Sequence, residues 1–170
     1  MERILVSACL MGRRVRFDGR AKTSDDELLA RWREEGRLVP FCPEVEGGLP
    51  VPRPPAEIEG GLGGAAVLSG AARVVTADGG DVTKAFLAGA YAALNVAQSM
   101  GIRVAILKEG SPSCGSLRIY DGSFRGSAVP GQGVTAALLK AHGIAVFGED
   151  RIADAARRLA ELEGSAVPPA

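Results

Sequence analysis

Three short apolar runs that each end close to a cysteine constrain the fold of this chain more than any other feature. The clearest run covers residues 104–107 with the sequence Val-Ala-Ile-Leu. It is short and partly β-branched, which is typical of a buried strand. The loop at residues 111–115, Ser-Pro-Ser-Cys-Gly, then places Cys114 among two hydroxyls, a proline and a glycine.

The other two cysteines follow strand-like runs in the same way. Residues 3–7 precede Cys9, and residues 37–41 precede Cys42. Ligands of open parallel sheets bind in the crevice outside the carboxyl ends of the strands. We therefore expect three thiols that are remote in sequence to converge at one edge of a mostly parallel, Rossmann-like sheet flanked by helices.

Length and composition indicate one compact α/β domain. The chain has 170 residues, of which 46% are hydrophobic and 24% charged, as is ordinary for a globular protein. We predict a single domain over residues 1–164 and a flexible tail over residues 165–170. Twenty basic residues balance 20 acidic ones, so the net charge indicates no particular partner.

Neither a signal peptide nor a membrane helix is expected. The first residues lack a basic segment leading into a long apolar run, and no stretch approaches the roughly 18 apolar residues that a membrane helix needs. We therefore predict a cytoplasmic protein that does not bind membranes.

The helices are predicted from the spacing of apolar residues and from the residues that can cap them. The first begins at Ser24 or Asp25 and ends near Glu35, before Gly36. Three further helices are expected near residues 83–100, 134–142 and 152–163.

Two other segments interrupt the alternation of strands and helices. Residues 51–58 contain too much proline for a helix or a central strand, so we expect a stiff, extended wall near the cysteine edge. Residues 65–68 and 73–76 are predicted to pair as a small hairpin.

The three cysteines suit a metal centre better than a disulfide framework. Their number is odd and no signal peptide is present. Buried thiols acting as small hydrophobic side chains are the alternative, but each cysteine lies in a loop with Gly, Pro or Ser. Structural zinc favours four ligands in close pairs, whereas three thiolates suit a soft metal or an iron–sulfur cluster. A cluster so held leaves one iron without a cysteine, and that iron can act as a Lewis acid.

The segments around the cysteines resemble the 2-thiouracil desulfurase family over nearly the whole chain. Met11 and Phe17 stand where relatives more often have Leu and Tyr. The segments that carry the resemblance are residues 7–12 (SACLMG), 15–19 (VRFDG), 42–45 (CPEV), 47–50 (GGLP), 52–53 (PR), 111–115 (SPSCG), 119–122 (IYDG) and 131–133 (GQG).

The resemblance implies a 4Fe-4S cluster on Cys9, Cys42 and Cys114, with one iron not bound by cysteine. It also implies an enzyme, a desulfurase that cleaves a C–S bond without redox chemistry. The substrate would be a thiolated pyrimidine, either a 2-thiouracil-like base or a thionucleoside. Water would replace C=S by C=O, and sulfide would be released.

Glu44 and Ser111 match the catalytic carboxylate and serine that the resemblance implies. Each also has a structural interpretation, because Glu44 can cap a turn and Ser111 can accept hydrogen bonds from loop amides. The candidate substrate contacts are Ser113, Asp18, Arg53 and Asp121. A salt bridge that fixes the proline-rich segment explains Arg53 equally well.

Two alternative functions stay open at this point. The same chemistry on thiolated tRNA would use the four arginines between residues 13 and 20 to bind phosphate, with a steep dependence on salt. A non-catalytic iron–sulfur sensor would release no sulfide from any thiolated base.

Overall fold

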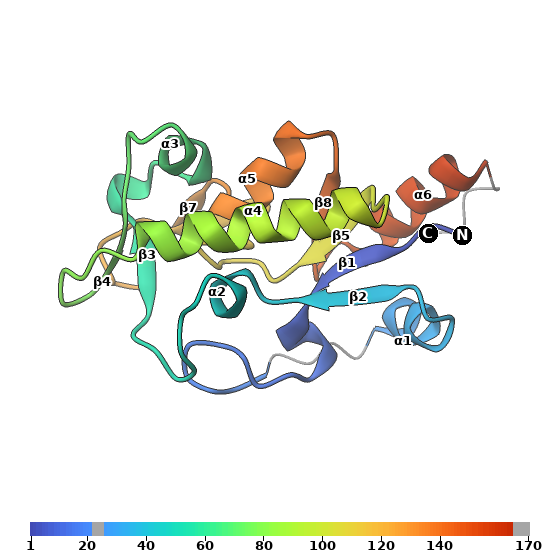
Figure 1. Cartoon of the computed structure of the whole chain (residues 1–170), viewed down its shortest axis with the longest axis horizontal. Helices are drawn as coiled ribbons and strands as arrows, with labels where there is room; N and C mark the ends of the chain where they lie inside the picture. The colour runs from blue at the N-terminus through green and yellow to red at the C-terminus, as the bar shows by residue number, and fades with distance from the viewer. Residues whose placement is uncertain (22–25, 165–170) are drawn as a thin grey trace.

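The computed structural model describes residues 1–21 and 26–164, and its centre is a four-stranded sheet (Figure 1). The strands lie in the order β2, β1, β5, β8, and each neighbouring pair is parallel. Their bounds are Ile4–Ser7 for β1, Leu38–Phe41 for β2, Val104–Leu107 for β5 and Ala145–Gly148 for β8. The predicted α/β fold with a parallel, helix-flanked sheet is confirmed, and the three strands that precede the cysteines lie side by side.

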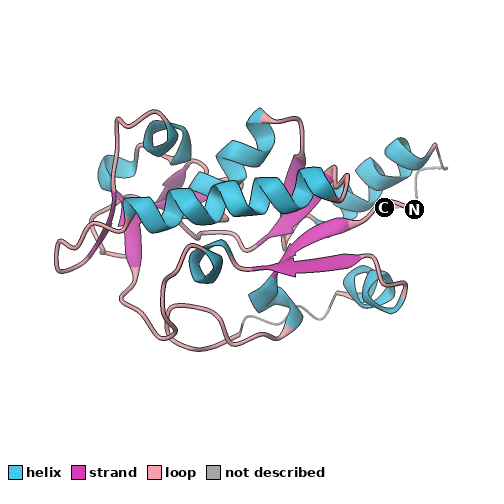
Figure 2. Cartoon of the chain, in the orientation of Figure 1, coloured by secondary structure: helices cyan, strands magenta, loops and turns pink. Residues whose placement is uncertain are grey.

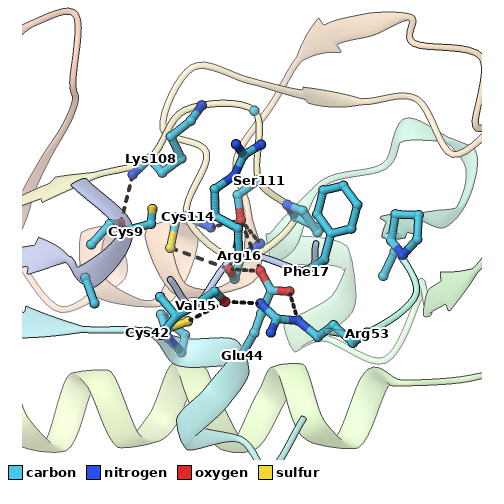
Figure 3. Close-up of a pocket in the computed structure, with 18 of the residues that line it drawn as sticks. Cys9, Val15, Arg16, Phe17, Cys42, Glu44, Arg53, Lys108, Ser111 and Cys114 are labelled. Carbon is cyan, nitrogen blue, oxygen red and sulfur yellow. Dashed lines mark hydrogen bonds and ion pairs between the residues drawn. The ribbon is translucent and has the colours of Figure 1, made fainter. Parts of the chain in front are cut away.

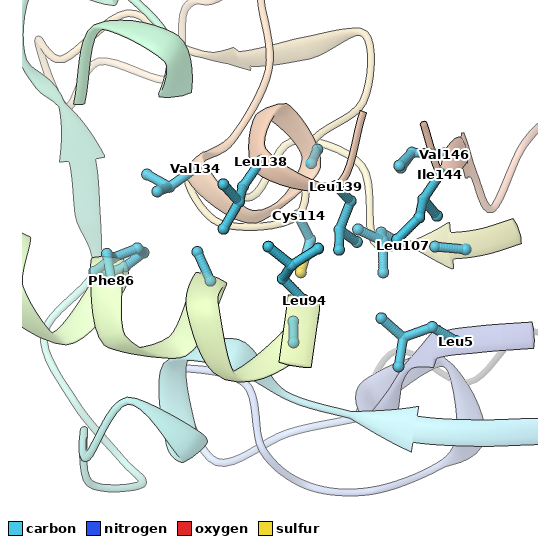
Figure 4. Packing of buried hydrophobic residues seen from close by; sticks show 14 of the residues in the cluster. Leu5, Phe86, Leu94, Leu107, Cys114, Val134, Leu138, Leu139, Ile144 and Val146 are labelled. Carbon is cyan, nitrogen blue, oxygen red and sulfur yellow. The ribbon is translucent and has the colours of Figure 1, made fainter. Parts of the chain in front are cut away.

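Helices cover both faces of the sheet (Figure 2). Successive side chains of a strand point to opposite faces, so Ile4 and Val6 pack with α1 and α6, whereas Leu5 packs with α4 and α5. Figure 4 shows this second apolar layer, which includes Leu94, Leu139 and Cys114. The helices are Glu27–Glu34 for α1, Thr83–Ser99 for α4, Val134–Ala141 for α5 and Ile152–Glu163 for α6.

The helix starts follow from local hydrogen bonding. The Asp26 carboxylate accepts the amide hydrogen of Leu28 at 2.8 Å and caps α1; the predicted caps Ser24 and Asp25 lie outside the described residues, as does the predicted tail. At α4 the Asp81 carboxylate accepts the amide hydrogen of Thr83 at 2.9 Å. Within residues 1–21 and 26–164, no helix combines the length and apolar character that crossing a membrane requires.

The predicted hairpin of residues 65–68 and 73–76 is wrong. The first run forms the short helix α3 (Gly64–Leu68), and β4 (Val74–Thr76) pairs antiparallel with β3 (Ala56–Ile58). A short apolar run fits a strand or a buried helix equally well by its pattern. Packing decides here, because α3 lies against α5 so closely that a Cβ atom on Gly64 would meet the Gly133 carbonyl oxygen at 2.3 Å. Other elements are the hairpin of β6 (Arg118–Tyr120) and β7 (Ala128–Pro130), with the 3-10 helices η1 (Ala8–Met11) and η2 (Glu59–Gly61).

The short helix α2 (Pro43–Glu46) begins directly after Cys42 and packs on α4. Its contact with α4 is close because glycines stand on both sides. A Cβ atom on Gly89 would lie 1.9 Å from the Pro43 carbonyl oxygen, and one on Gly47 would lie 2.0 Å from the Ala85 carbonyl oxygen. This backbone contact determines the position of Cys42 and of the α2 side chains relative to α4.

We expect Gly89→Ala to destabilise the protein although alanine is the better helix former. The added methyl group must displace backbone atoms of α2, so the free energy of unfolding should fall by about 1–3 kcal/mol in a urea titration. Asn95→Ala on the exposed side of the same helix is the control and should not lower it. An unchanged midpoint for Gly89→Ala would contradict the close contact.

Candidate active site

A cavity of about 340 Å³ opens beyond the carboxyl ends of β1, β2 and β5 (Figure 3). Cys9, Cys42 and Cys114 all line it, and all three are free thiols. The predicted convergence of the cysteines at one sheet edge is therefore observed. Residues 53 and 55–57 also line the cavity, so the proline-rich segment forms a wall beside the cysteines, as predicted.

Each cysteine is held by the turn that follows its strand. Cys9 lies buried in η1, immediately after β1. Cys42 is the residue before α2, and its sulfur lies 4.0 Å from the Val15 carbonyl oxygen. Cys114 is buried in a turn closed by the hydrogen bond from the Gly115 amide to the Ser111 carbonyl oxygen at 2.9 Å.

Burial makes these thiols hard to ionise. It raises the pKa of Cys114 to about 12 and that of Cys9 to about 11, and it also raises the pKa of Cys42. The proximity of Cys42 adds to the rise at both other thiols. Reactive cysteines have lowered pKa values, so this arrangement opposes a nucleophilic thiol. Thiolates form here when a bound cation compensates their charge.

The donor set suits a cluster more than a single ion. In the part of the chain that the structure describes, no three His, Cys, Asp or Glu side chains are grouped so as to hold one metal ion. Iron–sulfur clusters contain several metal atoms and are most often held by cysteine thiolates. Three soft sulfur donors around one cavity are consistent with such a group.

Glu44 lies at the start of α2, two residues after Cys42, and takes part in an ion pair and in hydrogen bonds (Figure 3). Arg53 Nε donates to Glu44 Oε1 at 3.1 Å, and the Ser113 hydroxyl donates to Glu44 Oε2 at 3.0 Å. The buried Arg53 also donates to the carbonyl oxygens of Pro50 and Val15 at 3.1 and 2.9 Å. It therefore fixes the proline-rich segment and also balances the charge of Glu44.

The two serines connect this carboxylate to the third cysteine. Ser111 Oγ accepts the amide hydrogens of Ser113 and Cys114, both at 3.1 Å, so it shapes the turn. The same oxygen lies 2.9 Å from Ser113 Oγ and 3.5 Å from Glu44 Oε2. Ser113 is buried, and its oxygen lies 3.5 Å from Cys114 Sγ. A continuous chain of polar groups thus runs from the carboxylate to the thiol.

Comparison with known proteins agrees with this geometry. The sequence pattern of the 2-thiouracil desulfurase family matches residues 4–151. The chain belongs to the 2-thiouracil desulfurase family. It is 50% identical to a solved structure described as the [4Fe-4S]-dependent thiouracil desulfidase TudS, with a TM-score of 0.86 over 95% of this chain and 99% of the other. It is also 46% identical over 151 residues to the uncharacterized protein YbbK of Bacillus subtilis (strain 168), which covers 89% of this chain and 98% of that protein.

The family predicted from the cysteine motifs is therefore confirmed. Both the family and the TudS neighbour support a C–S-cleaving desulfurase, as predicted, and neither favours the tRNA or sensor alternatives. The roles of individual side chains stay predictions, and the geometry bears on them unequally.

Two predicted substrate contacts of this family member do not line the cavity. The Asp18 carboxylate accepts the amide hydrogen of Arg20, and the Asp121 carboxylate accepts that of Ser123, each at 2.9 Å. Both are occupied in their own Asp-Gly turns, a common use of aspartate. The residues immediately before them, Phe17 and Tyr120, line the cavity instead.

Sequence reasoning also missed charged residues at this site. Lys108 lines the cavity beside Cys9 and pairs with Glu149, with 3.3 Å between Nζ and Oε1. Its backbone amide donates to the Ser7 hydroxyl at 2.9 Å, which joins the ends of β5 and β1. Lys108 directly follows a strand, as the cysteines follow theirs, and that position in the sequence could have identified it.

Glu109 holds the segment that follows Cys114. It is 1% exposed, and its carboxylate accepts hydrogen bonds from the amides of residues 116–118 at 2.8–3.0 Å and from the Ser116 hydroxyl at 2.6 Å. Burial alone would raise the pKa of this carboxyl, but these donors outweigh it and lower the pKa below its ordinary value of 4.5. Glu109 is therefore a charged anchor of the cysteine loop.

We expect Glu109→Gln to lower the free energy of unfolding by about 1–3 kcal/mol at pH 7, because the amide group turns a donor toward donors. Since the folded-state pKa lies below 4.5, the stabilisation by the carboxylate is present above pH 4.5 and is lost as the pH falls through the folded-state value. The difference in the free energy of unfolding between parent and variant should therefore become smaller at acidic pH.

Urea titrations of both proteins between pH 7 and pH 2.5 measure this difference in the free energy of unfolding, because the loss is expected below pH 4.5. Glu161→Gln, which removes an exposed carboxylate of α6, is the control and should change stability by less than about 0.5 kcal/mol. A gap for Glu109→Gln that stays constant over the whole pH range would contradict the assignment.

Proposed function

We propose that this protein is a 4Fe-4S-dependent desulfurase that replaces the C=S group of a thiolated pyrimidine base by C=O. The observation that carries the proposal is that three cysteines and a carboxylate–serine cluster face one cavity. The proposal also draws on the family of the chain and on its 50% identity to a [4Fe-4S]-dependent thiouracil desulfidase. Its cytoplasmic location is a further expectation from the sequence.

Cys9, Cys42 and Cys114 are the residues that would hold the cluster. When bound, the cluster supplies a Lewis-acidic iron without a cysteine ligand, which polarises the carbon–sulfur bond. Burial raises the pKa values of Cys9 and Cys114, so a cluster that binds these thiols must replace their protons.

In this proposal Glu44 takes a proton from the attacking water. Its Oε2 atom accepts hydrogen bonds from two hydroxyl groups, and Arg53 stabilises its charge from the other side. A general base must lie within hydrogen-bond reach of the proton that it removes, and the cavity lining gives Glu44 that access. The Ser111 and Ser113 hydroxyls orient the carboxylate and offer a path for returning the proton.

The overall reaction needs no oxidant or reductant. The water oxygen forms a bond to the thiolated carbon, and the carbon–sulfur bond breaks. The two hydrogens of the water leave with the sulfur as hydrogen sulfide, and a carbonyl group remains. The carbon keeps its oxidation state, so no electron transfer is required.

The size of the cavity favours a free base over a large nucleic acid. About 340 Å³ is at the low end of the roughly 300–1,000 Å³ of ligand sites, and a cluster would occupy part of it. Of the four arginines between residues 13 and 20, Arg16 alone lines the cavity. We therefore propose a base of the size of 2-thiouracil as the substrate in preference to thiolated tRNA.

Protein purified without oxygen should contain about four iron and four sulfide per chain, as expected for one cubane cluster. Cys114→Ala should contain little of either, because one of three ligands is lost. Iron and acid-labile sulfide analysis measures both. A parent protein that holds no iron after cluster reconstitution would overturn the proposal.

Glu44→Gln should retain the iron and sulfide content of the parent but desulfurate 2-thiouracil about 100-fold more slowly or worse, because general base catalysis contributes roughly 10²–10⁴. The assay follows sulfide release and uracil formation. Glu46→Gln changes the exposed carboxylate of the same short helix and should keep the parental rate. Parental turnover by Glu44→Gln would contradict the role of Glu44, and a loaded parent that releases no sulfide would favour the sensor.

A further inference from the structure

Two aromatic side chains at the cavity have no role in the chemistry proposed above. Phe17 and Tyr120 both line the cavity, yet they are 37% and 41% exposed. Large aromatic side chains in core positions of this protein are almost fully buried, as Trp32 and Phe86 are. Exposed aromatic faces beside a ligand cavity indicate a surface that a ligand covers.

The two rings reach the cavity from unrelated parts of the chain by the same local structure. Each immediately precedes an Asp-Gly pair, and each aspartate is used in its own turn. The turn at residues 16–20 is closed by the hydrogen bond from the Gly19 amide to the Arg16 carbonyl oxygen at 2.8 Å. Tyr120 ends β6, where it pairs with Ala128 of β7.

Both rings are carried by backbone that is fixed to the site. The Phe17 carbonyl oxygen accepts the amide hydrogen of Arg53, the partner of Glu44, at 2.7 Å. The Tyr120 ring lies against Gly110, where a Cβ atom would lie 3.8 Å from Cε2. Gly110 precedes the Ser111–Cys114 turn, so each ring has a defined place relative to the catalytic groups.

Most charged groups nearby already have partners. Glu44 pairs with Arg53, Lys108 pairs with Glu149, and Glu57 accepts the amide hydrogens of Gly122 and Phe124 at 2.9 and 3.2 Å. Phe41 also lines the cavity but packs against the core, unlike the two exposed rings. Arg16 also lines the cavity, so the surface left for a ligand combines two exposed aromatic rings with one guanidinium group. Such a surface fits a flat ring with polar groups at its edge.

We infer that Phe17 and Tyr120 form the surface on which the pyrimidine ring of the substrate stacks. This inference rests on the proposed function and specifies its substrate class as aromatic thiocarbonyl heterocycles. A base held by these rings can direct its sulfur toward the cysteines, which line the same cavity. Small thiocarbonyl compounds without a ring, such as thiourea, gain nothing from this surface.

The test compares Phe17→Ala and Tyr120→Ala with the parent, all loaded with cluster. Aromatic stacking on a base contributes enough for roughly a tenfold change in affinity per ring. We expect KM for 2-thiouracil to rise about tenfold in each variant, with kcat retained, and the affinity for the product uracil to fall by a similar factor in calorimetry. KM for thiourea should not change.

Matched variants separate stacking from folding. Tyr91→Ala removes a ring that is 55% exposed on α4 and does not line the cavity, so it should behave as the parent. Phe17→Tyr and Tyr120→Phe keep an aromatic ring and should retain the parental KM. Phe17→Leu and Tyr120→Leu keep apolar bulk without a ring and should raise KM. Iron content and circular dichroism verify that each variant is folded and loaded.

The outcomes distinguish this inference from the proposed function. An active parent whose alanine and leucine variants keep the parental KM and uracil affinity would overturn the stacking surface and leave the desulfurase proposal intact. A loaded parent without desulfurase activity would overturn both.

Discussion

The parallel pairing of β1 with β2 and β5 is the interaction on which the rest of the structure depends. It aligns three strands in one direction, so that their following loops meet at one edge. Each loop then needs only a short turn to deliver its cysteine to the cavity. The apolar layers on both faces hold this pairing in place, with α4 and α5 on one side and α1 and α6 on the other.

Buried charges keep the loops at this edge in position. Loops lack the regular hydrogen bonds of helices and strands, and buried polar groups without partners are costly. Arg53 donates hydrogen bonds to carbonyl oxygens of two loops while it pairs with Glu44. Glu109 accepts hydrogen bonds from the amides that follow Cys114. The same contacts that order the loops therefore also orient the carboxylate toward the cysteines.

The pKa values of the three thiols distinguish this site from that of a nucleophilic cysteine. A nucleophilic cysteine needs a lowered pKa, whereas burial raises the pKa values of all three thiols here. The three thiols are therefore protonated at neutral pH, which fits the proposal that the base is Glu44 and that the cysteines are ligands. With the exposed rings of Phe17 and Tyr120, the cavity lining supplies three proposed parts, namely the cluster ligands, the carboxylate for proton transfer and the ring-binding surface.

The sequence by itself determined the parallel sheet, most helices, the family and the convergence of the cysteines, because these features depend on local apolar patterns and on strand direction. It could not determine α3, since a short apolar run fits a strand or a helix until its packing against α5 decides. Nor could it choose between Asp18 and Phe17 at the cavity. In such a turn either side chain can point toward a cavity, and only the tertiary structure shows that Phe17 lines it and Asp18 does not. The physical reason is the hydrogen bond from the Arg53 amide to the Phe17 carbonyl oxygen, which holds this turn beside the cavity.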